Sequence, residues 1–214
     1  MRPVRRQRYH HGDLRESLIR ATIEIIEESG VRRFSLTEAT RRLGVAPSAP
    51  YAHFPDREAL LSEVAVRAYT SFNADYLPRV TRWKDPSDRV VAVAREYVRF
   101  ATGHRPLFET IYEVGLAPRV SPAVAQAARP LREVLRQSIQ ALPEARRPVS
   151  DRLAGAIEAV AHGYSMLYHY GEYGRDRSSR DRAADAAART TRALIESRDR
   201  LARDRGGARS LSRP

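Results

Sequence analysis

The residues best suited to chemistry lie in one stretch, Ser35 to Phe54, which reads SLTEATRRLGVAPSAPYAHF. Tyr51 and His53 carry hydrogen-bond donors, and Arg41 and Arg42 carry guanidinium groups. Such groups can bind and orient a partner without breaking a bond. The stretch is therefore more typical of binding than of catalysis.

Signs of enzymatic chemistry are few. The sequence has no G-x-S-x-G elbow, phosphate-binding Walker loop, H-E-x-x-H pair or dinucleotide-binding glycine signature. Glu158 and His162, one helical turn apart, could form an acid–base pair, although such a pair more often makes a buried hydrogen bond. Adjacent His10 and His11, with Asp13, lack the spacing of a metal-ligand pair. There is no cysteine. We therefore expect no enzymatic activity, no metal and no cofactor.

Two short helices and a tight turn are predicted to position these groups. Ser35 precedes Glu38 by three residues, the spacing of a capping box, so a helix is expected to start there. Gly44 supplies the left-handed residue that ends it. Pro47 suits the first turn of a second helix, which is expected to end near Phe54. This is the pattern of a helix-turn-helix, and a generic helix pair in a bundle is the alternative.

The flanking segments support the helix-turn-helix interpretation. Residues 13–30 predict a long amphipathic helix with Asp13 as its cap and Glu16 in the capping-box position. Apolar residues predict a small core for the head: Leu18, Ile25, Phe34, Leu36, Leu43, Val45, Tyr51 and Phe54. Residues 1–12 read as a flexible basic arm that follows a DNA backbone or enters a minor groove, with a solvated tail as the alternative.

This region resembles the TetR-type transcriptional regulators. The resemblance is carried, in order and spacing, by Phe34, Ser35, Leu36, Glu38, Leu43, Gly44, Val45, Pro47, Tyr51, His53, Phe54, Pro55, Ala59, Leu60 and Leu61. Ala39 and Thr40 depart from the expected branched apolar residue and alanine. Ala46 replaces the usual serine cap of the second helix, and the ring of Pro50 can crowd its first turn. The departures concern the geometry of the second helix.

The resemblance implies that Pro47, Ser48 and Ala49 lie nearest the bases and that Tyr51 and His53 contact the DNA backbone. The predicted DNA-binding residues are Arg5, Arg6, Arg8, Ser35, Thr37, Arg41, Arg42, Pro47, Ser48, Ala49, Tyr51, His53 and Arg57. The second helix has no bidentate Arg–guanine or Asn–adenine reader, so specificity is expected from other groups of the motif or from DNA shape.

Each of these assignments has a structural alternative. Tyr51 can be a core side chain with its hydroxyl at the surface, and His53 can cap a helix end. Arg41 and Arg42 can form an ordinary solvated helix face. Their joint placement on one short segment is what favours DNA contact.

The charge of the chain and its longest apolar run indicate its class of partner. The 214 residues include 38 Lys and Arg against 26 Asp and Glu, a formal net charge of +12 that favours an anionic partner. Lys84 is the only lysine, and arginine holds phosphates bidentately, although codon usage can produce the same bias. The longest apolar-rich run, 156–170, is shorter than the ~20 residues of a membrane span. We expect a soluble cytoplasmic protein with no membrane partner.

An all-α fold is predicted, with an amino-terminal three-helix helix-turn-helix head joined by a connector helix to a larger helical-bundle body. The Pro55–Asp56 junction opens the connector, which runs to about Asp75. Residues 76–88 read as an irregular linker, and later helices are expected at 87–103, 106–114, 122–142, 149–170 and 179–203. The expected domains are the arm (1–12), the DNA-binding domain (13–54), the effector-binding and dimerisation domain (55–205) and a disordered tail (206–214).

The body is where the resemblance implies an effector pocket and a homodimer interface. The predicted ligand-binding residues are aromatic residues and one histidine: Tyr97, His104, Phe108, Tyr112, Tyr164 and Tyr168. Such residues at helical spacing are more often core. Apolar and small residues on the last two helices are predicted to form a four-helix dimer interface, with monomer core as the alternative: Ile157, Val160, Ala161, Leu167, Ala184, Ala187, Thr191, Leu194 and Ile195.

The sequence thus predicts a homodimeric regulator that binds double-stranded DNA at a near-palindromic operator. The sign of regulation is expected to be repression, relieved by a small-molecule effector. Two rival functions remain open: a helical small-molecule-binding or sequestering protein without an operator, and a nonspecific DNA-coating protein.

Overall fold

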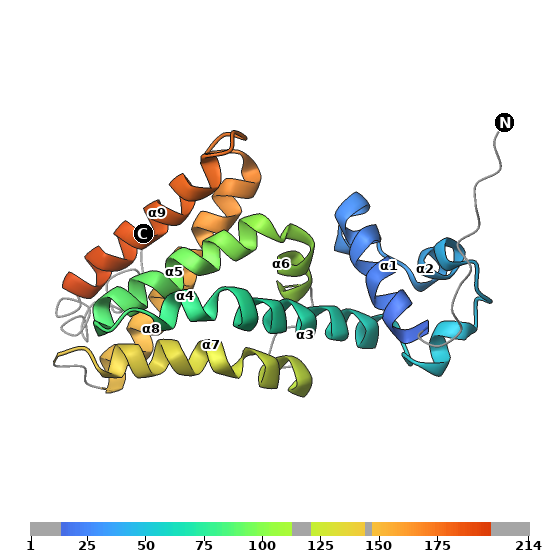
Figure 1. The fold of residues 1–214 in the computed structure, drawn as a ribbon, viewed down its shortest axis with the longest axis horizontal. Coiled ribbons are helices and arrows are strands. Elements are labelled where there is room, and N and C mark those ends of the chain that lie inside the picture. Colours follow the sequence, from blue (N-terminus) through green and yellow to red (C-terminus); the bar gives the residue numbers. More distant parts are fainter. Residues whose placement is uncertain (1–13, 113–120, 144–146, 198–214) are drawn as a thin grey trace, which may run out of the picture. The chain divides into compact units, whose positions relative to one another are not determined.

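The computed structural model describes residues 14–112, 121–143 and 147–197 (Figure 1). This part of the chain is helical and contains no strand, which confirms the predicted all-α class. The elements are α1 (Leu14–Ser29), η1 (Val31–Arg33), α2 (Leu36–Leu43), η2 (Ala49–Ala52), α3 (Arg57–Asp75), α4 (Leu77–Thr81), α5 (Pro86–Gly103), α6 (Arg105–Tyr112), α7 (Pro122–Gln140), α8 (Arg147–Tyr170) and α9 (Ser179–Glu196). The predicted arm at 1–12, the cap at Asp13 and the tail at 206–214 lie outside the described residues.

The chain divides into two compact units. The head unit comprises the described parts of 1–68 and 105–126, and the body unit comprises those of 69–104 and 127–214. The division falls within α3, whereas the sequence placed a domain boundary at 54/55. Leu60, Leu61 and Val64 explain the difference, since these α3 side chains are fully buried in the core of the head.

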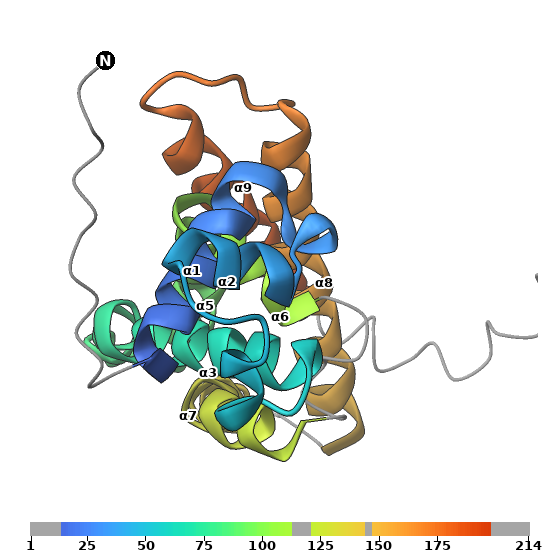
Figure 2. The ribbon, with the colours of Figure 1, turned by 90° about the vertical axis from the view of Figure 1, so that its right-hand side faces the viewer.

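Large apolar side chains form the core of the head unit. Leu18, Ile19, Ile25 and Ile26 recur at helical spacing along one face of α1 and are buried against Phe34, Ala39, Phe54 and the first half of α3. Figure 2 shows α1 and α2 lying against each other within this unit. These buried contacts hold α2 against α1, and they therefore set the direction in which the chain continues from α2 into the second segment of the motif.

Both predicted ends of α2 are confirmed. The Ser35 hydroxyl accepts a hydrogen bond from the Glu38 N–H at 3.2 Å, and Gly44 adopts φ 67°, with its N–H on the carbonyls of Thr40 and Arg41. The Glu38 carboxylate accepts from the Arg41 guanidinium and does not complete the capping box. The capping box is incomplete because the Arg41 guanidinium competes with the Ser35 N–H for the Glu38 carboxylate.

The second segment of the motif is a short 3-10 helix, η2 (Ala49–Ala52), and the predicted start near Pro47 is corrected accordingly. The N–H groups of Tyr51 and His53 bond to the carbonyls three residues before them, at 3.2 and 2.9 Å. Pro50 has no N–H to donate, and no side chain caps the segment. Without these groups an α-helical first turn is not stabilised, so the tighter turn results.

The body unit is built around three packed helices. Figure 1 shows α5 and α9 side by side, and α8 packs against both. Their shared core combines valine, leucine and isoleucine side chains with a row of buried alanines on α9: Ala183, Ala184, Ala187 and Ala188. Small side chains let helix axes approach closely, so this seam is tight.

The predicted irregular linker at 76–88 is only partly irregular. Its first half is the short helix α4, because Pro78 suits a first turn and Val80 is buried against Ala92 and Val93 of α5. The later helices begin within two residues of their predicted starts, but α6 and the first turn of α7 belong to the head unit and not to the predicted body. The last helix, α9, ends at Glu196 with Ser197 as its C-cap, and the predicted ends at 114 and 203 lie outside the described residues. Across the described ranges, no helix is long and apolar enough to cross a membrane.

Candidate nucleic-acid interface

Most residues predicted to meet DNA are exposed on the head unit. Thr37, Pro47, Ser48 and His53 are exposed, and 57% of Tyr51 is accessible. The interpretation of Tyr51 as a core side chain, including its place in the predicted head core, is therefore wrong. The phenol and imidazole groups stand at the surface, where they can donate to an external acceptor.

The 3-10 geometry explains this outward orientation. Pro50 is buried and Phe54 is 3% exposed, so the two residues anchor η2 and its exit against the head core. The Arg15 guanidinium lies 5.3 Å from the centre of the Phe54 ring, a cation–π contact that covers it. Tyr51 and His53, at the intervening positions, consequently face solvent.

Arg41 is exposed but already has a carboxylate partner. Its Nε and Nη2 donate to Glu38 at 2.9 and 2.7 Å, and this hydrogen bonding raises the pKa of Arg41 and lowers that of Glu38. Arg41 is the more exposed partner, at 74% against 32% for Glu38. An incoming phosphate would have to compete with Glu38 for this guanidinium.

Arg42 links α2 to α1. Its two terminal nitrogens donate to the Glu28 carboxylate at 2.8 and 2.6 Å, and this contact raises the pKa of Arg42 and lowers that of Glu28. The fork-to-fork geometry fixes the angle between the two helices. Arg42 thus holds α2 in place within the head.

Arg57 braces the head from the first turn of α3. Its Nη2 donates to the Val31 carbonyl at 2.8 Å and its Nε to the Phe34 carbonyl at 3.2 Å, and it lies 5.8 Å from the Phe34 ring centre. These contacts tie α3 to η1 just before α2. The phosphate contact assigned to Arg57 stays a prediction.

Two further ion pairs join α1 to α3. Arg15 donates to Glu63 at 2.6 Å, and Arg67 holds Glu16 bidentately, with one bond at 2.8 Å. The Glu16 carboxylate, which the sequence placed in a capping box, is engaged across the head. Together with Arg42 and Arg57, these pairs make a stiff support for the exposed motif.

Two exposed cations near the motif were missed by the sequence interpretation. Arg32 and Arg33 lie on η1, between Gly30 and Phe34, and both are exposed. In the sequence, two adjacent arginines shortly after a helix-ending glycine could have indicated these exposed cations. The predicted contacts of Arg5, Arg6 and Arg8 lie outside the described residues.

Three of the residues predicted to bind an effector belong to the body core. Tyr97, Tyr164 and Tyr168 are partly buried against the α5, α8 and α9 cluster. The Tyr97 hydroxyl lies 3.5 Å from His162 Nδ1, and the Tyr164 hydroxyl lies 2.8 Å from Thr190 Oγ1. These contacts favour the core interpretation, and a role in effector binding stays a prediction.

The other three predicted ligand residues lie elsewhere. His104 joins an aromatic cluster at the end of α3, where its Nε2 lies 3.2 Å from the Tyr76 hydroxyl. Phe108 and Tyr112 lie on α6 in the head unit, with ring centres 5.2 Å apart. The six residues therefore do not form one cluster within either unit.

The predicted dimer residues separate into core and surface. Six are buried within the single chain: Ile157, Ala161, Ala184, Ala187, Thr191 and Ile195. They pack in the α5, α8 and α9 core, which is the alternative that the sequence left open, so their assignment to an interface is corrected. Leu167 is 43% exposed, and Val160 and Leu194 are partly buried.

Two sequence profiles match the chain. One, described as bacterial regulatory proteins of the tetR family, matches residues 18–64, and the other, a tetracyclin repressor-like carboxy-terminal domain, matches residues 90–197. A Bacillus subtilis protein, the uncharacterized HTH-type transcriptional regulator YobS, is 29% identical over 98 residues, which are 46% of this chain and 51% of YobS. The chain thus spans about half the length of this curated relative.

Solved structures share the fold. A protein of unknown function from Rhodococcus sp. RHA1 is 30% identical, with a TM-score of 0.67 over 87% of this chain and 97% of that one. AibR, solved with isovaleryl coenzyme A and operator DNA, is 16% identical, with a TM-score of 0.61 over 82% of this chain and 96% of that one.

Proposed function

Because the chain belongs to the TetR family of regulatory proteins, we propose that it is a sequence-specific DNA-binding transcriptional regulator, acting as a repressor that a small molecule releases. The observation that carries the proposal is the exposed motif on the braced head. Tyr51, His53 and Ser48 project outward from a turn whose inner residues, Pro50 and Phe54, are buried.

In the proposed complex the motif enters a major groove. Ser48 and Ala49 lie nearest the base edges, while Tyr51 and His53 donate to backbone phosphates. Arg41 can exchange its Glu38 partner for a phosphate or a guanine, since an ion pair at the surface holds its members weakly. Because η2 is a single 3-10 turn, much of the specificity is assigned to DNA shape and to residues of α2.

A second copy of the chain is the proposed partner of α8. Gly155, Ala159, Gly163 and Leu167 recur every four residues on an accessible stripe of this helix. A Cβ at either glycine would meet nothing within 4 Å, so the fold of the single chain does not require glycine there. Glycine costs a helix interior about 1 kcal/mol relative to alanine. A closely approaching helix of a second copy accounts for both positions.

A homodimer would present two heads to the halves of a near-palindromic operator, about 34–36 Å apart. Release requires an effector that binds two head separations with different affinity. AibR, which shares the fold, was solved with both a coenzyme A ester and operator DNA. For this chain we propose only that one small molecule and one operator DNA bind to it, without naming either.

Sequencing the DNA retained by the purified protein from random duplexes tests the main proposal. A regulator is expected to enrich one near-palindromic sequence and to bind it roughly 10³-fold or more tightly than random DNA at the same salt concentration. A coating protein would show steep salt dependence with no such ratio, and a sequestering protein would retain no duplex. Either result would overturn the proposal.

A matched pair of variants locates the contact. Tyr51→Ala combined with His53→Ala is expected to weaken operator binding by about tenfold or more while the far-UV circular dichroism stays unchanged, because both side chains are exposed. Arg132→Ala, an exposed residue on α7, is the control and should bind as the wild type does. Equal binding by the double variant would remove η2 from the interface.

A further inference from the structure

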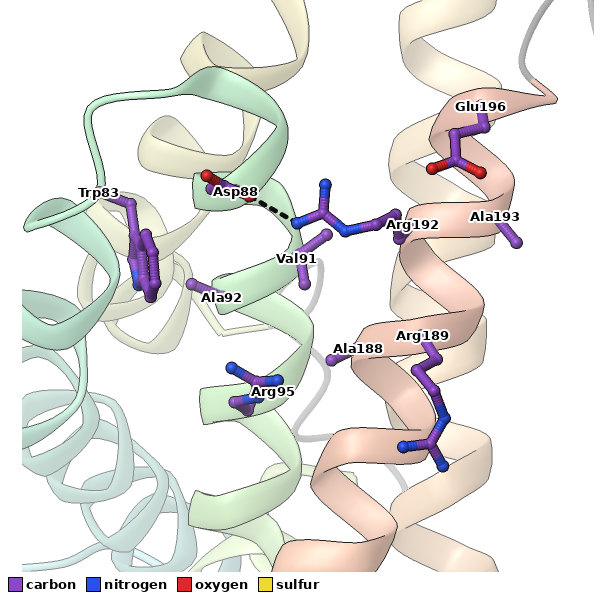
Figure 3. A pocket seen from close by; sticks show the side chains of 10 residues that line it. All are labelled: Trp83, Asp88, Val91, Ala92, Arg95, Ala188, Arg189, Arg192, Ala193 and Glu196. Carbon is purple, nitrogen blue, oxygen red and sulfur yellow. Dashed lines mark hydrogen bonds and ion pairs between the residues drawn. The ribbon is translucent and has the colours of Figure 1, made fainter.

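A groove of about 300 Å³ lies between α5 and α9 in the body unit (Figure 3). Its floor is apolar, made by Val91 and Ala92 of α5 and Ala188 of α9, and the indole of Trp83 forms one wall. None of the residues that the sequence assigned to effector binding lines it. The volume is at the lower end of the roughly 300–1,000 Å³ typical of small-molecule sites.

Trp83 offers an aromatic face held in a fixed position. Its side chain is 36% exposed, although large aromatic side chains are usually covered. The Arg82 guanidinium lies 5.3 Å from the ring centre, and Arg89 donates to the Trp83 carbonyl through Nε at 3.0 Å and Nη2 at 2.8 Å. The wall is therefore ordered by its own neighbours while part of the indole remains accessible.

Three guanidinium groups line the groove, those of Arg95, Arg189 and Arg192. Arg192 Nη2 donates to Asp88 at 2.5 Å, which links α9 to α5. Arg95 Nε lies 3.0 Å from the Asp185 carboxylate but is not aligned for a hydrogen bond, and no other described contact engages this guanidinium. A guanidinium carries five N–H donors in a planar fork, so the outer edge of Arg95 can hold a carboxylate bidentately.

The charges of the rim favour an anion. Asp88 and Glu196 also line the groove, but the three guanidinium groups outnumber these two carboxylates, so a negatively charged group is attracted there. The apolar floor and the indole favour a flat apolar ring over a sugar. Figure 3 shows Trp83 and Arg95 on either side of Ala92, so one ligand can meet both.

We propose that the α5–α9 groove binds a small aromatic monocarboxylate, whose ring lies against Trp83 over Ala92 and whose carboxylate pairs with Arg95. Binding of this ligand does not depend on any activity toward DNA. Only a further role of the groove as the effector site rests on the function proposed above.

Tryptophan fluorescence gives a direct measurement, because Trp83 is the only tryptophan of the chain. The full-length protein is titrated with 4-nitrobenzoate and, in parallel, with neutral 4-nitrobenzamide, which matches its shape and absorbance. The carboxylate is expected to quench the emission saturably and to bind about tenfold more tightly than the amide, the difference expected for one charge-assisted contact. Equal quenching by the two probes, or no saturation, would overturn the proposal.

Variants separate the groove from nonspecific binding to a basic surface. Arg95→Gln is expected to weaken binding of 4-nitrobenzoate about tenfold and to leave binding of the amide unchanged, whereas Arg132→Gln on α7 should bind both probes as the wild type does. Calorimetric titration of Trp83→Ala with benzoate should show loss of binding without a change in the circular dichroism. Unchanged carboxylate affinity in Arg95→Gln would remove the groove from consideration.

Operator binding by the same proteins keeps the two proposals apart. Arg95→Gln is expected to bind the selected DNA as the wild type does, because Arg95 lies in the body unit. Saturable quenching by a protein that selects no DNA would support the groove and reject the regulator. Selective DNA binding without saturable quenching would do the reverse.

Discussion

The head and body units both use guanidinium–carboxylate pairs, but they place them in different environments. In the head, Arg42 and Glu28 pair at the surface, with side chains 26% and 61% exposed. In the body, Glu96 is only 4% exposed and lies between Arg99, at 2.9 Å, and Arg79, at 3.5 Å. The same chemistry therefore orients helices in one unit and neutralises a buried charge in the other.

The buried pair also connects more of the chain. Arg79 lies on α4, Glu96 and Arg99 on α5, and Arg99 continues to Asp181 of α9 at 3.0 Å. Burial by itself would lower the pKa of Arg99, but Glu96 and Asp181 outweigh it and raise that pKa. One oxygen of Glu96 has no hydrogen bond among the described contacts. The exposure of the paired groups to water, and not the number of ion pairs, therefore decides how much each pair contributes to stability.

The largest effect is expected for the buried carboxylate. Arg99→Met leaves Glu96 in the interior with only Arg79 nearby, and breaking a buried pair in this way costs about 3–5 kcal/mol. We expect a loss near the lower end, about 3 kcal/mol, in urea unfolding followed by circular dichroism. Glu96→Met together with Arg99→Met should recover much of it, since no charge is then stranded. A loss below about 1 kcal/mol in the single variant would erase the contrast between the units.

A second test compares a buried and an exposed position on α9. Ala187→Leu adds volume to the tight α5–α9 seam, where Ala187 is fully buried, and overpacking typically costs about 1–3 kcal/mol. Ala193→Leu on the same helix is the control, because Ala193 is exposed and should change the free energy of unfolding by less than about 0.5 kcal/mol. Equal effects in the two variants would show that the seam is looser than its alanines indicate.

Surface pairs of the head should respond weakly. Arg67→Gln removes the bidentate contact with Glu16. The side chain of Arg67 is 38% exposed and that of Glu16 is 28% exposed, so the expected loss of unfolding free energy is below about 1 kcal/mol. A double-mutant cycle with Glu16→Gln measures the coupling of the pair directly. A coupling above about 2 kcal/mol would place this pair with the buried one and would blur the comparison.

The smallest effect is a pH dependence in the body. Burial lowers the pKa of His162, and nearby Glu158 raises it only in part. The unfolded chain therefore takes up the proton more readily, so the stability from neutral His162 is present above pH about 6.5 and is lost as the pH falls. The urea midpoint of the wild type should decline from pH 7.5 to 5.5 more than that of His162→Gln. Parallel declines would assign the pH dependence to other groups.

Local sequence explained much of the head before the fold was known. Ser35 and Gly44 bond to backbone groups within four residues of themselves, so the start and end of α2 follow from spacing alone. Ala46 and Pro50 indicated an altered second helix for the same reason. That the alteration is a 3-10 turn, with Tyr51 outside and Pro50 inside, depended on how η2 meets the core.

The sequence by itself determined the all-α class, the positions of the helix-turn-helix and of the later helices, and the family, since these follow from short-range hydrogen bonding and apolar periodicity. Only the tertiary structure decided which apolar faces are covered. It placed Ile157 and Ala187 in the core of one chain, engaged Arg57 with backbone carbonyls, and brought Trp83 and Arg192, far apart in sequence, to one groove. Burial depends on which helices pack together, and spacing along one helix shows a face without showing its partner.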